Sequence, residues 1–136
     1  MRVLVCGGRN VGRTNPNATH LNAKAEVQRA TNERTFVFDY LSTIHKEKSF
    51  TEVIGGDEGG AERLGMHWAV VNKVPQKLYS RTSKRETIIG RNKRMLTGSN
   101  PDLIIAFGSG VSTEILIGAA KEKGVQVIEV AIPDFQ

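Results

Sequence analysis

The feature that most constrains this chain is a regular alternation of short apolar runs and longer amphipathic segments. Runs rich in Val, Ile, Leu or Phe occur at residues 2–6, 51–54, 76–79, 103–107 and 126–130. Such runs are typical of strands buried in a parallel sheet. Segments with apolar residues at helical spacing lie between them, at about 36–48, 61–72, 85–97 and 112–123. The alternation predicts an α/β, Rossmann-like three-layer sandwich with a mostly parallel five-stranded sheet.

The chain has 136 residues, which predicts a single domain, 1–136, with one core. One segment departs from the alternation: residues 11–33 are polar and include Pro16. We interpret them as an extended loop or insertion with a helical turn around residues 23–30. Cys6 is the single cysteine, so no intramolecular disulfide is expected, and no apolar run is long enough to span a bilayer. These features predict a cytoplasmic protein.

Glycine-containing turns follow three of the predicted strands, at residues 7–9, 55–60 and 108–110. The carboxyl ends of parallel strands meet at one edge of the sheet, where ligands of this fold class bind. Glycine lets the backbone approach a ligand closely, and the following helix N-terminus favours phosphate. The turns therefore predict a site for a phosphate-bearing ligand, the alternative being merely tight turns. No P-loop and no complete dinucleotide fingerprint is present.

Four motifs follow one another along the chain, and together they resemble a known family. They are Val5-Cys6-Gly7-Gly8-Arg9, Gly55-Gly56-x-x-Gly59-Gly60-Ala61-Glu62-Arg63-Leu64, Arg91-Asn92-x-x-Met95 and Ala106-Phe107-Gly108-Ser109-Gly110-x-Ser112-Thr113. The series is similar to the YspA-like branch of the SLOG superfamily, whose relatives include the lonely-guy phosphoribohydrolases and SLOG nucleotide-sensor domains. The resemblance covers the chain except residues 11–33. It implies a Rossmann-like fold that binds nucleotides or NAD- and ADP-ribose-like derivatives.

The turns and the resemblance together name a set of candidate ligand-binding residues. They are Gly7, Gly8, Arg9, Gly56, Gly59, Gly60, Ala61, Glu62, Arg91, Asn92, Gly108, Ser109, Gly110, Ser112 and Thr113. The guanidinium of Arg9 suits a phosphate, with a surface ion pair as the alternative. For Arg91, a ligand role and a structural brace are equally open. Glu62 at a helix N-terminus is stabilised by the helix dipole whether or not it holds ribose hydroxyls.

A departure from the phosphoribohydrolases concerns catalysis. Their glutamate lies three positions beyond the loop threonine, where this chain has Leu116, and the nearest carboxylate is Glu114. Cleavage of a glycosidic bond needs a carboxylate at the reacting carbon. We therefore expect the protein to hold its ligand as a sensor or sequestering protein, without a cofactor or a metal. An N-glycosidase that uses Glu62 or Glu114 as its catalytic residues is the alternative.

A second alternative is single-stranded nucleic-acid binding by the basic residues between 73 and 94. It ranks lowest because few aromatic side chains are available to stack on bases. The family tendency implies a homo-oligomer, most simply a dimer, with the helices that bear Trp68 or Met95 as candidate contacts. Cys6 and Trp68 themselves are expected in the core, and His20, His45 and His67 share no metal-ligand spacing.

Overall fold

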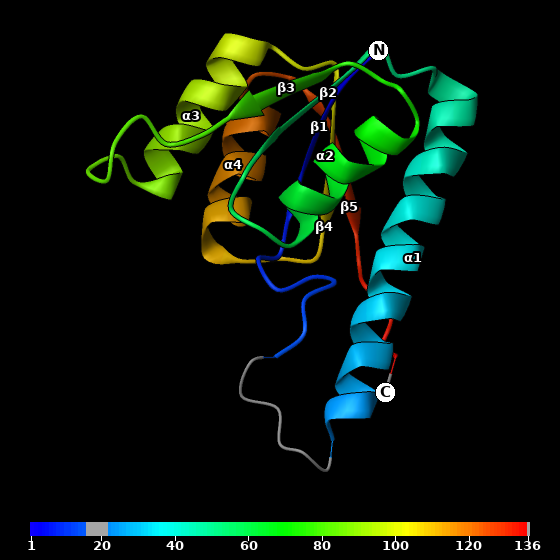
Figure 1. The fold of residues 1–136 in the computed structure, drawn as a ribbon. Coiled ribbons are helices and arrows are strands. Elements are labelled where there is room, and N and C mark those ends of the chain that lie inside the picture. The colour runs from blue at the N-terminus through cyan, green and yellow to red at the C-terminus, as the bar shows by residue number, and fades with distance from the viewer. Residues whose placement is uncertain (16–21, 136) are drawn as a thin grey trace.

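The computed structural model describes residues 1–15 and 22–135, in which five strands alternate with four helices (Figure 1). The elements are β1 (Arg2–Gly7), α1 (Ala23–Lys48), β2 (Glu52–Gly56), α2 (Ala61–Val71), β3 (Gln76–Tyr79), α3 (Ile88–Ser99), β4 (Leu103–Phe107), α4 (Val111–Glu122) and β5 (Gln126–Val130). All neighbouring strands pair in parallel, in the order β3-β2-β1-β4-β5. The predicted Rossmann-like α/β sandwich is confirmed.

Helices cover both faces of the sheet (Figure 1). Val3 and Val5 of β1 pack in one apolar cluster with residues of α1 and α2. Leu4 and Cys6, which alternate with them along the strand, pack in a second cluster with residues of α3 and α4. Because the central strands are buried on both faces, they consist of continuous apolar runs rather than alternating ones.

The strand order reverses between β1 and β4. From β1 the chain moves outward to β2 and β3, then crosses back to β4 and β5 on the other side of β1. β1 and β4 are in register to their ends, with Gly7 opposite Phe107, and the amide of Gly8 donates to the carbonyl of Phe107 at 2.8 Å. In open parallel sheets, the crevice beyond such a reversal is the usual place for a ligand.

The first helix is the main departure from the sequence prediction. α1 begins at Ala23, so the helical turn expected around residues 23–30 is the first part of a long helix, and the interpretation of residues 31–33 as a loop is wrong. This half of α1 has no apolar stripe, and ion pairs stabilise its helical conformation instead. Arg29 contacts Glu26 one turn before it and Glu33 one turn after it. Residues 16–21 of the predicted insertion, with Pro16 and His20, lie outside the described residues.

Two predicted core residues are confirmed. Trp68 is fully buried, and its indole N–H donates to Ser42 Oγ at 3.0 Å. Cys6 is also buried, and burial raises the pKa of its thiol to about 12, with the negative charge of Glu62 adding to the effect. Met95 is fully buried too, so any contact between copies through α2 or α3 would use other faces of these helices. No helix in the described residues is both long enough and apolar enough to cross a membrane.

Candidate functional site

The predicted ligand-binding residues lie at the carboxyl edge of the sheet, and the structure divides them into two groups. One group surrounds the turn after β2 and contains Glu62, Arg91 and Asn92. The other lies at the ends of β1 and β4 and contains Arg9, together with the turn that leads into α4. The two groups differ in what occupies the space between their loops.

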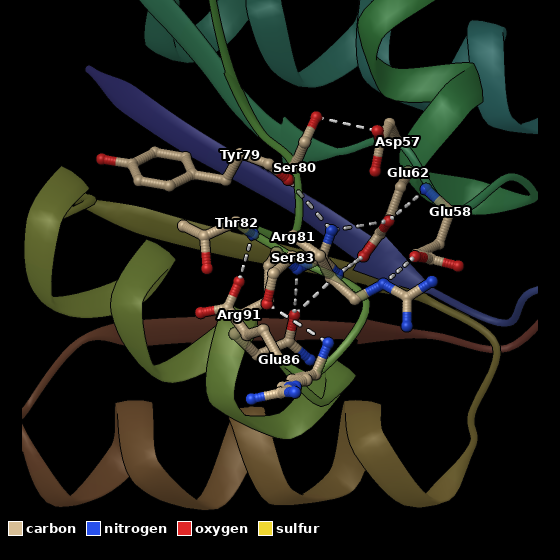
Figure 2. Close-up of polar contacts among 12 residues, drawn as sticks. Asp57, Glu58, Glu62, Tyr79, Ser80, Arg81, Thr82, Ser83, Glu86 and Arg91 are labelled. Atoms are coloured by element: carbon tan, nitrogen blue, oxygen red, sulfur yellow. Dashed lines mark hydrogen bonds and ion pairs between the residues drawn. The ribbon is translucent and has the colours of Figure 1, made fainter.

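In the first group, Glu62, Arg91 and Asn92 form a hydrogen-bonded cluster that we call the brace. Figure 2 shows the contact between Glu62 and Arg91. Arg91 is fully buried, and its Nη2 and Nη1 contact the two carboxylate oxygens of Glu62 at 2.5 and 3.3 Å. Nε and Nη2 also donate to Oδ1 of Asn92, and Nη1 donates to the carbonyl of Tyr79 at 3.2 Å. These bonds use all five guanidinium N–H groups. The arrangement favours the structural role of Arg91 over the ligand role.

Several of the glycines predicted to contact a ligand lie close to the brace or to the backbone of a neighbouring loop or strand. A Cβ at Gly56 would overlap Nη1 of Arg91 and approach Oε2 of Glu62. At Gly60 it would meet the carbonyls of Gly8 and Arg9, and at Gly7 the carbonyl of Phe107. At these three positions, the close approach that requires glycine is to the protein's own atoms.

The two candidate catalytic carboxylates, Glu62 and Glu114, lie in different surroundings. Glu62 is 8% exposed, and its carboxylate also accepts a hydrogen bond from the amide of Glu58 at 3.0 Å. Glu114 is exposed in the first turn of α4. Neither lines the crevice between the ends of β1 and β4.

That crevice is a cavity of about 290 Å³ at the point where the strand order reverses. It brings together four of the predicted residues: Gly8, Arg9, Gly108 and Ser109. Its other lining residues are Asn10, Val11, Arg29, Glu33 and Ile132. We call this cavity the crevice. The side chain of Arg9 is exposed and makes no ion pair or hydrogen bond with any described residue.

Beside the crevice, the turn after β4 leads into the N-terminus of α4. Gly110 is the N-cap residue, no described side chain caps this end, and a Cβ on Gly110 would meet nothing within 4 Å. The first amide groups of a helix have no partner within the helix, so an uncapped end can donate to an anion. The buried hydroxyl of Thr113 donates to the carbonyl of Gly7 at 3.1 Å. It ties α4 to the end of β1.

Arg29 and Glu33 were missed by the sequence analysis because they lie in the segment interpreted as a loop. Nη1 of Arg29 contacts Glu33 Oε2 at 2.6 Å, and Nη2 donates to the carbonyl of Arg13 at 2.6 Å. Glu33 Oε1 accepts from the amide of Gly12 at 2.9 Å. Hydrogen bonds to Glu26 and Glu33 raise the pKa of Arg29, and the bond from Arg29 lowers the pKa of Glu26. The N-terminal half of α1 therefore holds the loop after β1 in place.

The spacing of these charges was a signal in the sequence. Glu26, Arg29 and Glu33 are three and four residues apart, the separations at which opposite charges stabilise a helix. A search for charge pairs at helical spacing, in addition to apolar periodicity, would have predicted the N-terminal half of α1.

The basic stretch between residues 73 and 94 is partly neutralised. Arg94 contacts Glu86 at 2.9 Å. Arg81 contacts Glu58 at 3.4 Å (Figure 2). The hydrogen bond from Arg94 is the largest cause that lowers the pKa of Glu86 to about 2. This surface is less positive than its sequence suggests.

The described histidines have structural contacts. His45 Nδ1 accepts from the amide of Phe50 at 2.9 Å, and the ring of His67 lies edge-on to Phe38. In residues 1–15 and 22–135, no three His, Cys, Asp or Glu side chains are close enough together to hold a metal ion.

Comparisons with known proteins do not assign this chain to a family. No protein-family model, curated protein or solved structure matches this chain. The similarity to the SLOG superfamily is therefore an expectation that stands on the four sequence motifs, beside a Rossmann-like fold that the structure shows.

Proposed function

We propose that the protein binds a nucleotide-derived small molecule in the crevice, as a sensor or a sequestering protein. Candidate ligands are a nucleoside monophosphate and ADP-ribose- or NAD-like compounds. The observation that carries the proposal is the cavity at the strand reversal. There, Arg9 and the α4 N-terminus, neither of which is paired or capped by a described side chain, lie at the same edge of the sheet. A guanidinium and free helix amides are the two groups that most often hold a phosphate.

The lining of the crevice provides for the other parts of such a ligand. Glu33 contributes carboxylate oxygens that can accept hydrogen bonds from ribose hydroxyls, and Val11 and Ile132 contribute apolar surface for a base. The volume of about 290 Å³ is at the small end of ligand pockets. It favours a ligand of nucleoside monophosphate size, or one such half of a larger dinucleotide.

Binding without turnover is better supported than hydrolysis. Glu62 is held in the brace, and Glu114 does not line the crevice. Glu33 does line it, but its two oxygens already accept hydrogen bonds from Arg29 and from the amide of Gly12. A general base must reach the attacking water. Glu62 and Glu114 lie outside the crevice, and Glu33 is paired with Arg29.

The test is a thermal-shift assay with AMP, ADP-ribose and NAD, followed by mass spectrometry of the recovered ligand. We expect at least one compound to raise the melting temperature and to be recovered intact. Arg9→Gln should abolish the shift. Arg85→Gln removes the same charge as Arg9→Gln, but Arg85 is exposed and does not line the crevice, so this variant should keep the shift.

Two results would contradict the proposal. Release of a free base that Glu62→Gln or Glu114→Gln abolishes would identify an N-glycosidase instead. No shift with any compound, together with salt-sensitive binding of single-stranded DNA, would favour the nucleic-acid alternative.

A further inference from the structure

A second cavity, of about 400 Å³, lies between α1, α2 and the loop after β1, and it shares only Val11 with the crevice. Its lining residues are Val11, Gly12, Arg13, Arg34, Gly59, Gly60, Arg63, Leu64 and His67. Three of them are arginines and none is acidic. We call this space the arginine cavity.

The three arginines have no carboxylate partner among the described residues. Arg13 and Arg63 are exposed, and their side chains make no hydrogen bond or ion pair with any described residue. Arg34 donates only to neutral groups, the carbonyl of Gly12 at 2.7 Å and the hydroxyl of Thr31 at 3.1 Å. Elsewhere, five arginines each contact a carboxylate: Arg2, Arg29, Arg81, Arg91 and Arg94. The arginine cavity therefore concentrates positive charge that the described protein does not neutralise.

Small and apolar residues form its walls beside these charges. The lack of a side chain at Gly59 lets the guanidinium of Arg13 lie close to the backbone, since a Cβ there would be 3.2 Å from Nη1 of Arg13. Val11 and Leu64 provide apolar lining, and Gly60 is the N-cap residue of α2, an end that no described side chain caps. A second pocket adjoins the cavity through Arg34, Leu64 and His67, and it adds Thr35, Phe38 and Asp39. Asp39 is the one acidic side chain that lines either space.

We propose that the arginine cavity is a binding site for a small polyphosphate, which is either a free anion or the phosphate chain of a nucleotide. Guanidinium groups form paired hydrogen bonds with phosphate oxygens, and here no carboxylate competes for Arg13 or Arg63. Three positive charges around one space require an anion with more than one negative charge to balance them. The site is separate from the crevice and from the proposed monophosphate ligand there.

The test is calorimetric titration of the full chain at low salt with pyrophosphate, tripolyphosphate and ADP. We expect binding that weakens as salt is added, because exposed charges are screened. Arg13→Gln and Arg63→Gln should each weaken it by about tenfold or more, the usual loss for one charge-assisted hydrogen bond. Arg85→Gln is the control for net charge, and Arg9→Gln is the control for the crevice. Both should bind like the wild type.

Comparing the probes identifies the source of the phosphates. ADP that binds more tightly than pyrophosphate, with the difference lost in Phe38→Ala, indicates a nucleotide whose base lies in the adjoining pocket. Equal affinities indicate a free anion. The melting temperature of Arg63→Gln without anion tests whether Arg63 stabilises the fold. Because the substitution removes repulsion between neighbouring arginines, the variant should be at least as stable as the wild type.

The proposal is overturned if neither pyrophosphate nor tripolyphosphate binds at about millimolar concentration. It is also overturned if Arg13→Gln and Arg63→Gln bind normally, or if Arg85→Gln loses as much affinity as they do. Loss of binding in Arg9→Gln alone would place the anion in the crevice instead.

Discussion

The two halves of the carboxyl edge of the sheet are built from similar sequence, yet they differ in what occupies them. In both, glycines lie at the end of a strand or in the turn after it, and a helix follows. After β2, the side chains of Glu62 and Arg91 occupy the space beside Gly56 (Figure 2). After β4, the space beside Gly110 is open, and the crevice lies next to it. A glycine-rich turn after a strand therefore indicates close approach, while the rest of the fold decides whether protein or ligand approaches.

The largest expected effect comes from breaking the brace. Arg91→Ala leaves the buried carboxylate of Glu62 without its cation, and removing one partner of a buried ion pair costs about 3–5 kcal/mol. Urea unfolding followed by circular dichroism measures it. Arg94→Ala, on the same helix but in a more exposed ion pair, should cost much less, because solvent screens exposed ion pairs. Equal losses for the two variants would show that the brace is not special.

The two turns can be compared directly with one substitution in each. Gly56→Ala places a methyl group against Arg91 and Glu62, and we expect a loss of about 1–3 kcal/mol from overpacking. Gly110→Ala enters open space with an extended backbone, so its cost should be no more than about 1 kcal/mol, the loss of N-cap preference from Gly to Ala. Thermal unfolding of both variants measures the difference. The reverse ranking would mean that the β4 turn, not the β2 turn, is the packed one.

A smaller effect is expected where α1 holds the loop after β1. Glu33→Gln weakens the contact with Arg29, while its amide oxygen can still accept from Gly12. We expect a loss of about 1 kcal/mol, since a hydrogen bond to a charged group contributes about 1.5–3 kcal/mol and part is retained. Hydrogen exchange at the Gly12 and Arg13 amides should become faster. Unchanged exchange there would show that α1 does not hold the loop.

The smallest expected effect is on the loss of stability at acidic pH. The pKa of Glu86 lies at about 2, below its ordinary value of 4.5, mainly because of its bond with Arg94. A depressed carboxyl pKa contributes stability that is present above the ordinary value and lost as pH falls toward the folded value. Between about pH 4.5 and pH 2, Glu86→Gln should therefore lose slightly less stability than the wild type. Parallel pH curves for the two proteins would contradict this.

Several elements could be predicted from the sequence closely. β3, β4 and β5 have the predicted bounds, and α2 and α4 agree to within one residue at each end. These elements are specified by local features: apolar runs for buried strands, apolar stripes for helices and glycines at their ends. The first half of α1 was missed because charge pairs and bonds to the loop after β1 stabilise it, and these leave no apolar stripe.

For the candidate site, the sequence by itself determined that glycine turns and helix N-termini lie at one edge of a parallel sheet. Hydrophobic periodicity specifies the sheet, and strand direction specifies the edge. Only the tertiary structure decided which turn stays open. Arg91 reaches Gly56 from α3, and Glu33 reaches the crevice from α1. Contacts between residues far apart in the chain depend on how the layers pack, and local sequence patterns do not specify that packing.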